Sequence, residues 1–158
     1  MKKYDLYTTI PYAFQFPFDV PQGTEVVIRG ATRTCEYAYK LKLKSGGGGR
    51  TVATLTEPAG DIFELLVDTP RNSIGLITPL LMSREDAQDF TASLMLVVSE
   101  LCDRMRPKGM RLSEQDRLAR DRPLFDLIES TRQRWDREHA ARVKQMGRLN
   151  RDQRDALH

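Results

Sequence analysis

The stretch RTCEYAYKLKLK, from Arg33 to Lys44, decides the fold class of the first half of this chain. Apolar and polar residues alternate along almost all of it. The positions on one side are apolar or aromatic: Cys35, Tyr37, Tyr39, Leu41 and Leu43. Those on the other side are polar: Thr34, Glu36, Lys40, Lys42 and Lys44. A period of two residues is typical of a strand with one face in a core and one in solvent, so this stretch predicts such a strand.

Further strands are predicted on both sides of it. They are rich in β-branched and aromatic residues and are bounded by Pro and Gly turns: Lys3–Thr9, Thr24–Arg29, Arg50–Leu55 and Asp61–Asp68. The last has apolar residues on both faces, which indicates a central strand covered on both sides. Pro11–Pro21 holds three prolines with three phenylalanines between them. Because proline cannot donate to a ladder, this segment predicts an edge strand or an extended segment laid over the core.

Four consecutive glycines, Gly46–Gly49, separate two of these strands. Two explanations stay open: a natural flexible hairpin tip, or an engineered linker that replaces a longer loop. In either case so short a connection predicts that Arg50–Leu55 returns antiparallel to the preceding strand. Further on, Ser73–Met82 is apolar but contains Pro79, which argues against an uninterrupted helix, and its structure is left open.

From Ser83 the apolar period becomes helical. Ser83 is a predicted N-cap, and Glu85 and Asp86 follow at the positive end of the helix dipole. Pro107 and Gly109 end the helix, which is therefore expected over 84–105. Its apolar residues share one face that covers the sheet: Ala87, Phe90, Leu94, Val97, Val98, Leu101 and Met105.

The remaining residues predict a charged helical extension. Ser113 caps a short helical piece, Glu114–Arg120, and Pro123 starts another helix that runs to about Arg148. The apolar stripe thins after Ile128, so the first part can dock while the second projects or meets a partner. Runs of strands followed by helices predict an α+β fold: an antiparallel sheet of about four to six strands, a covering helix and a helical extension. We expect an α+β domain over 1–106, β-rich over 1–70, and the extension over 107–158.

Composition bounds the class of protein. The 158 residues suffice for one domain with a core. The positive charge lies in the extension, where residues 107–158 hold 13 basic and 9 acidic residues. Such mixed signs attract nucleic acid only weakly. We find neither an apolar signal region nor a run of about 18 apolar residues, and expect a soluble cytoplasmic protein. The preference for Arg over Lys indicates a bacterial or phage-like source.

No catalytic or metal motif is found in the sequence. Cys35 and Cys102 occupy apolar-face positions and are expected to be buried free thiols. The only histidines, His139 and His158, are expected at the surface. There is no CxxC, HExxH or phosphate-loop pattern, and the carboxylates of Asp61–Asp68 are too widely spaced along one strand to share an ion. We therefore expect a protein that is not an enzyme and uses no metal or cofactor.

Basic residues form two groups. One is the strand face with Lys40, Lys42 and Lys44, near Arg50, which fits either a solvated face, edge protection or a track for a phosphate backbone. The other lies on the extension and fits a helix laced by ion pairs, a protein-binding arm or a nucleic-acid arm. Its candidate nucleic-acid contacts are Arg132, Arg134, Arg137 and Arg142.

The functional hypothesis is an interaction protein, an adaptor or a subunit of a larger assembly that binds through its helical extension. Trp135 is the predicted anchor, because a large aromatic residue among charges is a common hot spot. Val143 and Met146 complete the predicted partner site; the competing interpretation packs Trp135 on its own domain. The alternative function is nucleic-acid binding through the basic groups. A protein partner is expected, with nucleic acid as the second candidate, and neither a membrane nor a small-molecule substrate.

Overall fold

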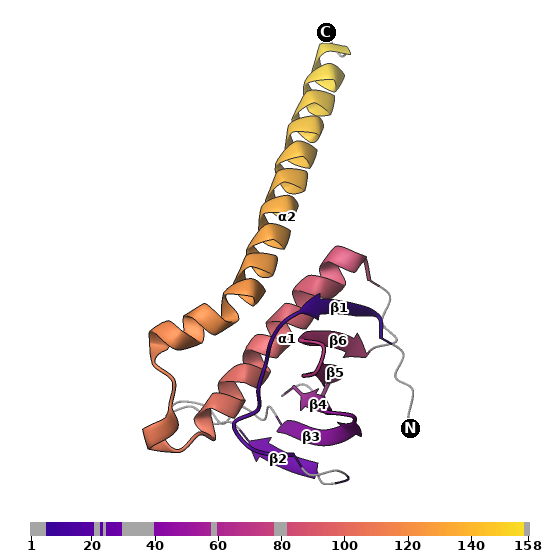
Figure 1. The fold of residues 1–158 in the computed structure, drawn as a ribbon. Coiled ribbons are helices and arrows are strands. Elements are labelled where there is room, and N and C mark those ends of the chain that lie inside the picture. Colours follow the sequence, from indigo (N-terminus) through magenta and orange to yellow (C-terminus); the bar gives the residue numbers. More distant parts are fainter. Residues whose placement is uncertain are drawn as a thin grey trace.

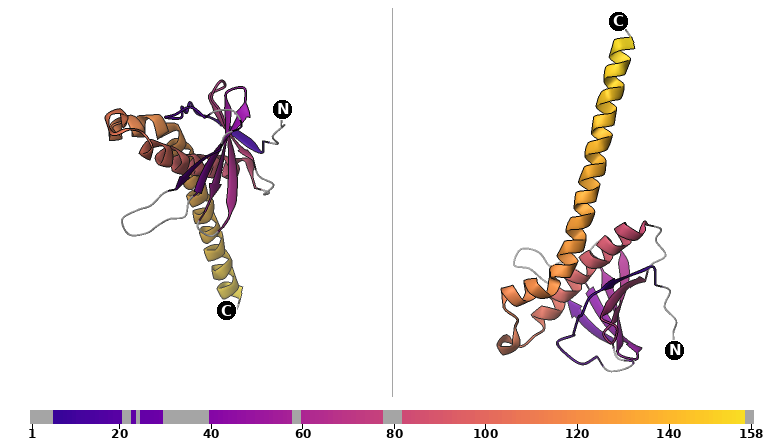
Figure 2. Two further views of the ribbon diagram at one scale, coloured as in Figure 1. Left: turned by 90° about the horizontal axis from the view of Figure 1, so that it is seen from below. Right: turned by 45° about the horizontal axis from the view of Figure 1, so that its top comes forward.

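The computed structural model describes residues 6–20, 23, 25–29, 40–57, 60–77 and 82–156. It shows a six-stranded antiparallel sheet followed by two long helices, which confirms the predicted α+β fold (Figure 1). The first helix crosses one face of the sheet, and the second leaves the body as a long rod (Figure 2). The C-terminus therefore lies far from the sheet.

In the sheet, the second to sixth strands form a meander, and the first strand pairs with the sixth at one edge. The strand order is β1-β6-β5-β4-β3-β2, and every neighbouring pair is antiparallel. The strands are β1 (Thr8–Pro11), β2 (Glu25–Arg29), β3 (Lys40–Gly47), β4 (Arg50–Thr56), β5 (Ile62–Asp68) and β6 (Ser73–Ile77). The segment 73–82, whose structure the sequence left open, therefore begins with a strand. Residues 3–5 of the predicted strand Lys3–Thr9 lie outside the described residues. β1 begins at Thr8 and ends on Pro11, which an edge strand tolerates.

Of the alternating stretch Arg33–Lys44, the structure describes the residues from Lys40 onward. There Leu41 and Leu43 are fully buried, while Lys40, Lys42 and Lys44 are exposed, as the alternation predicts. The positions Cys35, Tyr37 and Tyr39 lie outside the described residues. β3 is flanked by β2 and β4, so the lysines are not on an edge strand, and their interpretation as edge protection is wrong.

The glycine run forms a tight hairpin turn between β3 and β4. Gly47, Gly48 and Gly49 have φ values of 80°, 63° and 78°. A two-residue turn with positive φ at both central residues has the twist that antiparallel strands need. A Cβ atom on Gly49 would also lie 2.9 Å from the Pro70 ring. Two local constraints, backbone conformation and space, therefore favour glycine here.

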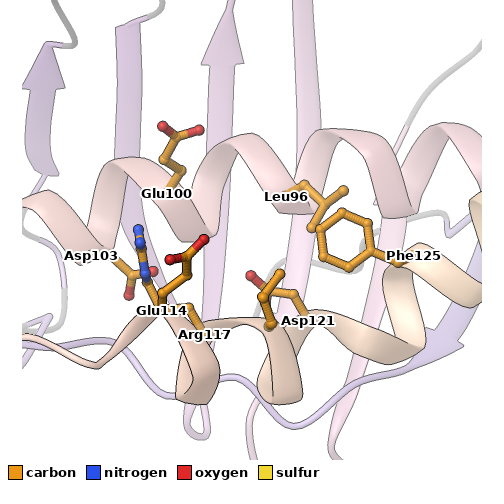
Figure 3. A pocket seen from close by; sticks show the side chains of 8 residues that line it. Leu96, Glu100, Asp103, Glu114, Arg117, Asp121 and Phe125 are labelled. Carbon is orange, nitrogen blue, oxygen red and sulfur yellow. The ribbon is translucent and has the colours of Figure 1, made fainter.

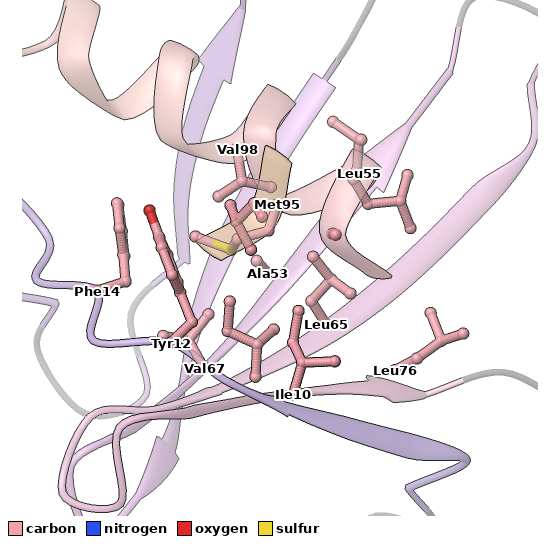
Figure 4. Packing of buried hydrophobic residues seen from close by; sticks show 14 of the residues in the cluster. Ile10, Tyr12, Phe14, Ala53, Leu55, Leu65, Val67, Leu76, Met95 and Val98 are labelled. Atoms are coloured by element: carbon pink, nitrogen blue, oxygen red, sulfur yellow. The ribbon is translucent and has the colours of Figure 1, made fainter. Parts of the chain in front are cut away.

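The core lies between the sheet and α1 (Arg84–Arg104) (Figure 4). The Ser83 hydroxyl accepts a hydrogen bond from the Asp86 amide at 3.2 Å, which confirms the predicted N-cap. The predicted apolar face is mostly right, but Met105 caps the helix C-terminus and is exposed. Polar residues of α1 are buried as well, namely Thr91, Ser99 and Asp103. They are buried because a second helix and an extended segment pack beside α1.

The extended segment of residues 12–20 lies over the core, one of the two structures expected for it. Tyr12 and Phe14 are buried, and Phe16 meets Phe14 edge to face with ring centroids 5.0 Å apart. Figure 4 shows Tyr12 and Phe14 beside Met95 and Val98 of α1. The segment thus closes the end of the core that the sheet leaves open.

The extension is one continuous helix, α2 (Glu114–Ala156), after a short 3-10 turn, η1 (Lys108–Met110). The prediction of two helices separated before Pro123 is wrong, since Pro123 lies inside α2. Proline removes one backbone hydrogen bond and bends a helix without necessarily ending it. α2 changes direction in its first third (Figure 1). The predicted cap is confirmed, because Ser113 accepts from the Asp116 amide at 3.1 Å.

Candidate interaction surface

The second part of α2 projects from the body with its side chains in solvent. We call Trp135–Arg148 the arm. Every side chain from Trp135 to Met146 is exposed. The three predicted partner-binding residues, Trp135, Val143 and Met146, are 60%, 56% and 64% exposed. Their spacings of eight and three residues place them on one side of the helix, so the structure brings the predicted site together as an apolar stripe.

Trp135 is held by a neighbour on the same helix. Its ring stacks on that of His139, with centroids 5.1 Å apart and planes 4° from parallel. Residues four apart are neighbours on a helix surface, so the stack follows from the sequence spacing. It restricts the indole rotamers, and less side-chain entropy is then lost when a partner covers it.

The arm begins where α2 stops touching α1. Arg134 is half-buried, and its guanidinium lies 3.5 Å from Glu85 and 3.3 Å from Asp86, at the start of α1. Burial raises the pKa of the nearby Asp89 carboxyl, and the charge of Asp86 adds to the effect. Arg134 was a predicted nucleic-acid contact, but it is engaged inside the chain. Arg132, Arg137 and Arg142 are exposed.

At the other end of α1, a buried polar cluster joins three separate segments. We call it the Arg120 cluster; it comprises Tyr12, Ser99, Asp103, Arg120 and Asp121. The Arg120 guanidinium donates to both carboxylate oxygens of Asp103 at 2.7 Å. It also donates to Asp121 at 2.9 and 3.0 Å. The Tyr12 hydroxyl donates to Asp121 and lies 3.4 Å from the Ser99 hydroxyl oxygen.

The electrostatics of the cluster favour a neutral Tyr12 phenol and a charged Arg120 guanidinium. Burial raises the pKa of the Tyr12 hydroxyl, and its hydrogen bond to Asp121 acts in the same direction. Burial alone would lower the pKa of Arg120, but the hydrogen bonds to Asp103 and Asp121 outweigh it and raise the pKa. A neutral phenol and a charged guanidinium are the donors that two carboxylates need. The arrangement therefore fixes α2 on α1 and on the N-terminal segment.

Sequence reasoning missed this cluster. Its members lie at positions 12, 99, 103, 120 and 121, so no local spacing joins them. The buried thiol of Cys102 next to it was predicted, and burial raises the pKa of that thiol to about 12. Such a thiol is an inert core group.

Beside the Arg120 cluster a groove runs between α1 and the start of α2 (Figure 3). Its volume is about 350 Å³. Its apolar residues are Leu96, Leu118 and Phe125, of which the last two are 53% and 43% exposed. Its charged residues are Glu100, Asp103, Glu114, Arg117 and Asp121. The groove is thus lined by apolar side chains, and the charged residues exposed at its margin are Glu100, Glu114 and Arg117.

The basic strand face is partly neutralised within the chain. Lys42 lies 3.2 Å from Glu25 on β2, and Arg50 lies 3.5 Å from Asp68 on β5. Lys40 and Lys44 are exposed on the same face. The structure therefore aligns the predicted residues, but two of the four cations have carboxylate partners.

Comparisons with known protein families, curated proteins and solved structures give no match to this chain. Within the described residues, no three His, Cys, Asp or Glu side chains are grouped so that they could hold a metal ion. In the same part of the chain, no helix combines the length and apolar character needed to span a bilayer.

Proposed function

We propose that this protein is a non-enzymatic adaptor or assembly subunit that binds a protein partner through the arm. The observation that carries the proposal is the exposed stripe of Trp135, Val143 and Met146 on a helix that has left its own core. Full burial of one large apolar side chain contributes about 1.5–3 kcal/mol. Trp135 is the expected anchor, because interface hot spots are enriched in Trp.

The test of this proposal is the substitution Trp135→Ala. Because the indole contacts little of the body, the melting temperature should change by only a few degrees, whereas capture of the partner from the native host should be lost. Ile62→Ala is the control, since Ile62 is 62% exposed, much like Trp135, but belongs to β5 and not to the arm. A variant that melts far lower yet keeps its partner would contradict the proposal.

Nucleic-acid binding is a second candidate, supported by the exposed row of Lys40, Lys42 and Lys44. If it is right, affinity for a mixed-sequence oligonucleotide should fall steeply with added salt, because phosphate contacts release counterions. Replacing the three lysines with Gln should remove the binding, whereas Trp135→Ala should leave it intact. No detectable binding at low salt would exclude this function.

A further inference from the structure

We infer that the partner of the arm is a second copy of this chain, whose groove receives Trp135. This inference rests on the proposed function and names its partner. The chemistries of the arm and the groove match: an apolar stripe with basic flanks can enter an apolar groove whose lining has more acidic than basic residues.

The groove has the size and lining that an aromatic anchor needs. Its volume of about 350 Å³ lies at the lower end of the roughly 300–1,000 Å³ typical of ligand pockets. Leu96 and Phe125 point toward one another across it (Figure 3), and Leu118 adds a third apolar wall. Leu118 and Phe125 are exposed in the single chain, so a docked indole would cover them.

The charges of the two surfaces are complementary. Residues 132–148 hold six basic and two acidic residues. Arg132 and Arg142 lie three before and seven after Trp135, and therefore on its side of the helix. In the groove, Asp103 and Asp121 already bind Arg120. Two carboxylates, Glu100 and Glu114, and one guanidinium, Arg117, are exposed at its margin, which leaves an excess of acidic over basic lining residues. Glu100 is paired with Arg104, a surface pair that an incoming guanidinium can exchange.

The arm cannot fill the groove of its own chain. Arg134, next to Trp135, is paired with Asp86 at the start of α1, whereas the groove lies along Leu96–Asp103. At 1.5 Å per residue, Asp86 and Glu100 are separated by about 21 Å along the helix. Beyond Arg134 the arm points away from the body (Figure 1). Two copies can instead exchange arms about a twofold axis, and each arm then enters the groove of the other.

Pairing of the two arms with each other is disfavoured by their charge. Both arms would bring the same excess of basic residues together, and like charges on adjacent helix faces repel. Docking of helix into groove avoids this repulsion, because each basic arm meets carboxylates. It is also an established way to bind an amphipathic helix.

A charge exchange tests the inference. The arm variant Arg132→Glu with Arg142→Glu and the groove variant Glu100→Arg with Glu114→Arg should each be monomeric in sedimentation velocity, while the wild type is a dimer. An equimolar mixture of the two variants should recover the dimer. In the mixed dimer the acidic arm meets the basic groove and the basic arm meets the acidic groove, so both contacts pair opposite charges. The control Arg137→Glu with Lys144→Glu makes the same charge change on the opposite side of the arm and should remain dimeric.

Circular dichroism establishes that each variant is folded. If the groove variant does not fold, Leu118→Ala takes its place; its side chain is half-exposed, and it should weaken dimerisation by about tenfold or more. A wild type that stays monomeric at its highest soluble concentration, or a dimer that survives both charge reversals, would overturn the inference. If the wild type is monomeric but Trp135→Ala still abolishes capture of a different protein, the second-copy inference is wrong while the proposed function stands.

Discussion

The Arg120 side chain is largely buried and contacts two carboxylates and an aromatic ring. Its guanidinium makes four hydrogen bonds to two carboxylates and lies over the Phe14 ring, 5.7 Å from the centroid. The planar fork of arginine can make four hydrogen bonds to Asp103 and Asp121 at once, whereas the ammonium group of lysine has only three donors and no fork geometry. The choice of residue at this position therefore determines how the N-terminal segment, α1 and α2 are joined.

Removal of this guanidinium should be costly. Arg120→Ala leaves the buried carboxylate of Asp121 without a cation and that of Asp103 with Arg106 alone, 3.6 Å away. Breaking such a buried pair costs about 3–5 kcal/mol. Urea unfolding should report a loss of this size, with a smaller loss for Arg120→Lys. Arg122→Ala is the control, because Arg122 is exposed and should change stability by about 0.5 kcal/mol or less. An equally small loss for Arg120→Ala would show that the cluster adds little stability.

At the scale of elements, the β3–β4 hairpin shows how a turn can depend on both conformation and space. Gly48 and Gly49 both have positive φ, but only at Gly49 would an added Cβ atom meet another group, the Pro70 ring. The two positions therefore separate the backbone contribution from the steric one. They also explain why a run of glycines forms an ordered turn here.

Alanine substitutions should resolve these contributions. Gly48→Ala should destabilise the protein by about 1–2 kcal/mol, the cost of left-handed backbone for a residue with a Cβ atom. Gly49→Ala should cost more, since the Pro70 ring must also move. Gly48→Asn should be tolerated better than Gly48→Ala, because Asn adopts this conformation more readily. The measurement is the unfolding free energy in urea, and equal values for the two alanine variants would contradict the steric argument.

At the scale of the whole molecule, the chain divides by what each part contributes to stability. The sheet, α1 and α2 as far as Ile128 share one core, in which Leu124 is fully buried. The arm adds a long exposed surface without joining that core. Stability therefore depends on the body, and the arm is free to carry the proposed interaction.

Two truncations test this division. A chain that ends at Arg134 should remain folded and melt within a few degrees of the full chain, because the side chains from Trp135 to Met146 are all exposed. A chain that ends at Arg132 also loses the contacts of Arg134 with Glu85 and Asp86, and should melt slightly lower. Both should lose partner binding. Insolubility of the longer truncation would show that the arm is part of the core.

The sequence by itself determined the features that depend on neighbours along the chain. Alternation placed Leu41 and Leu43 in the core and the lysines outside, and Ser83 and Ser113 were recognisable as helix caps. The thin stripe after Ile128 indicated a helix whose second part projects or meets a partner, while the packing of Trp135 was left open. Strand period, capping and helix amphipathicity are short-range properties, because each depends on residues only two to four positions apart.

Only the tertiary structure decided which distant residues meet. It joined Tyr12 to Asp121 and Asp103 to Arg120, paired Arg134 with the start of α1, and formed the groove from two helices. It also let α2 continue through Pro123, where local rules predicted a new helix. These outcomes depend on how helices and sheet pack in space, and the packing free energy of many distant contacts outweighs the preference of any single position.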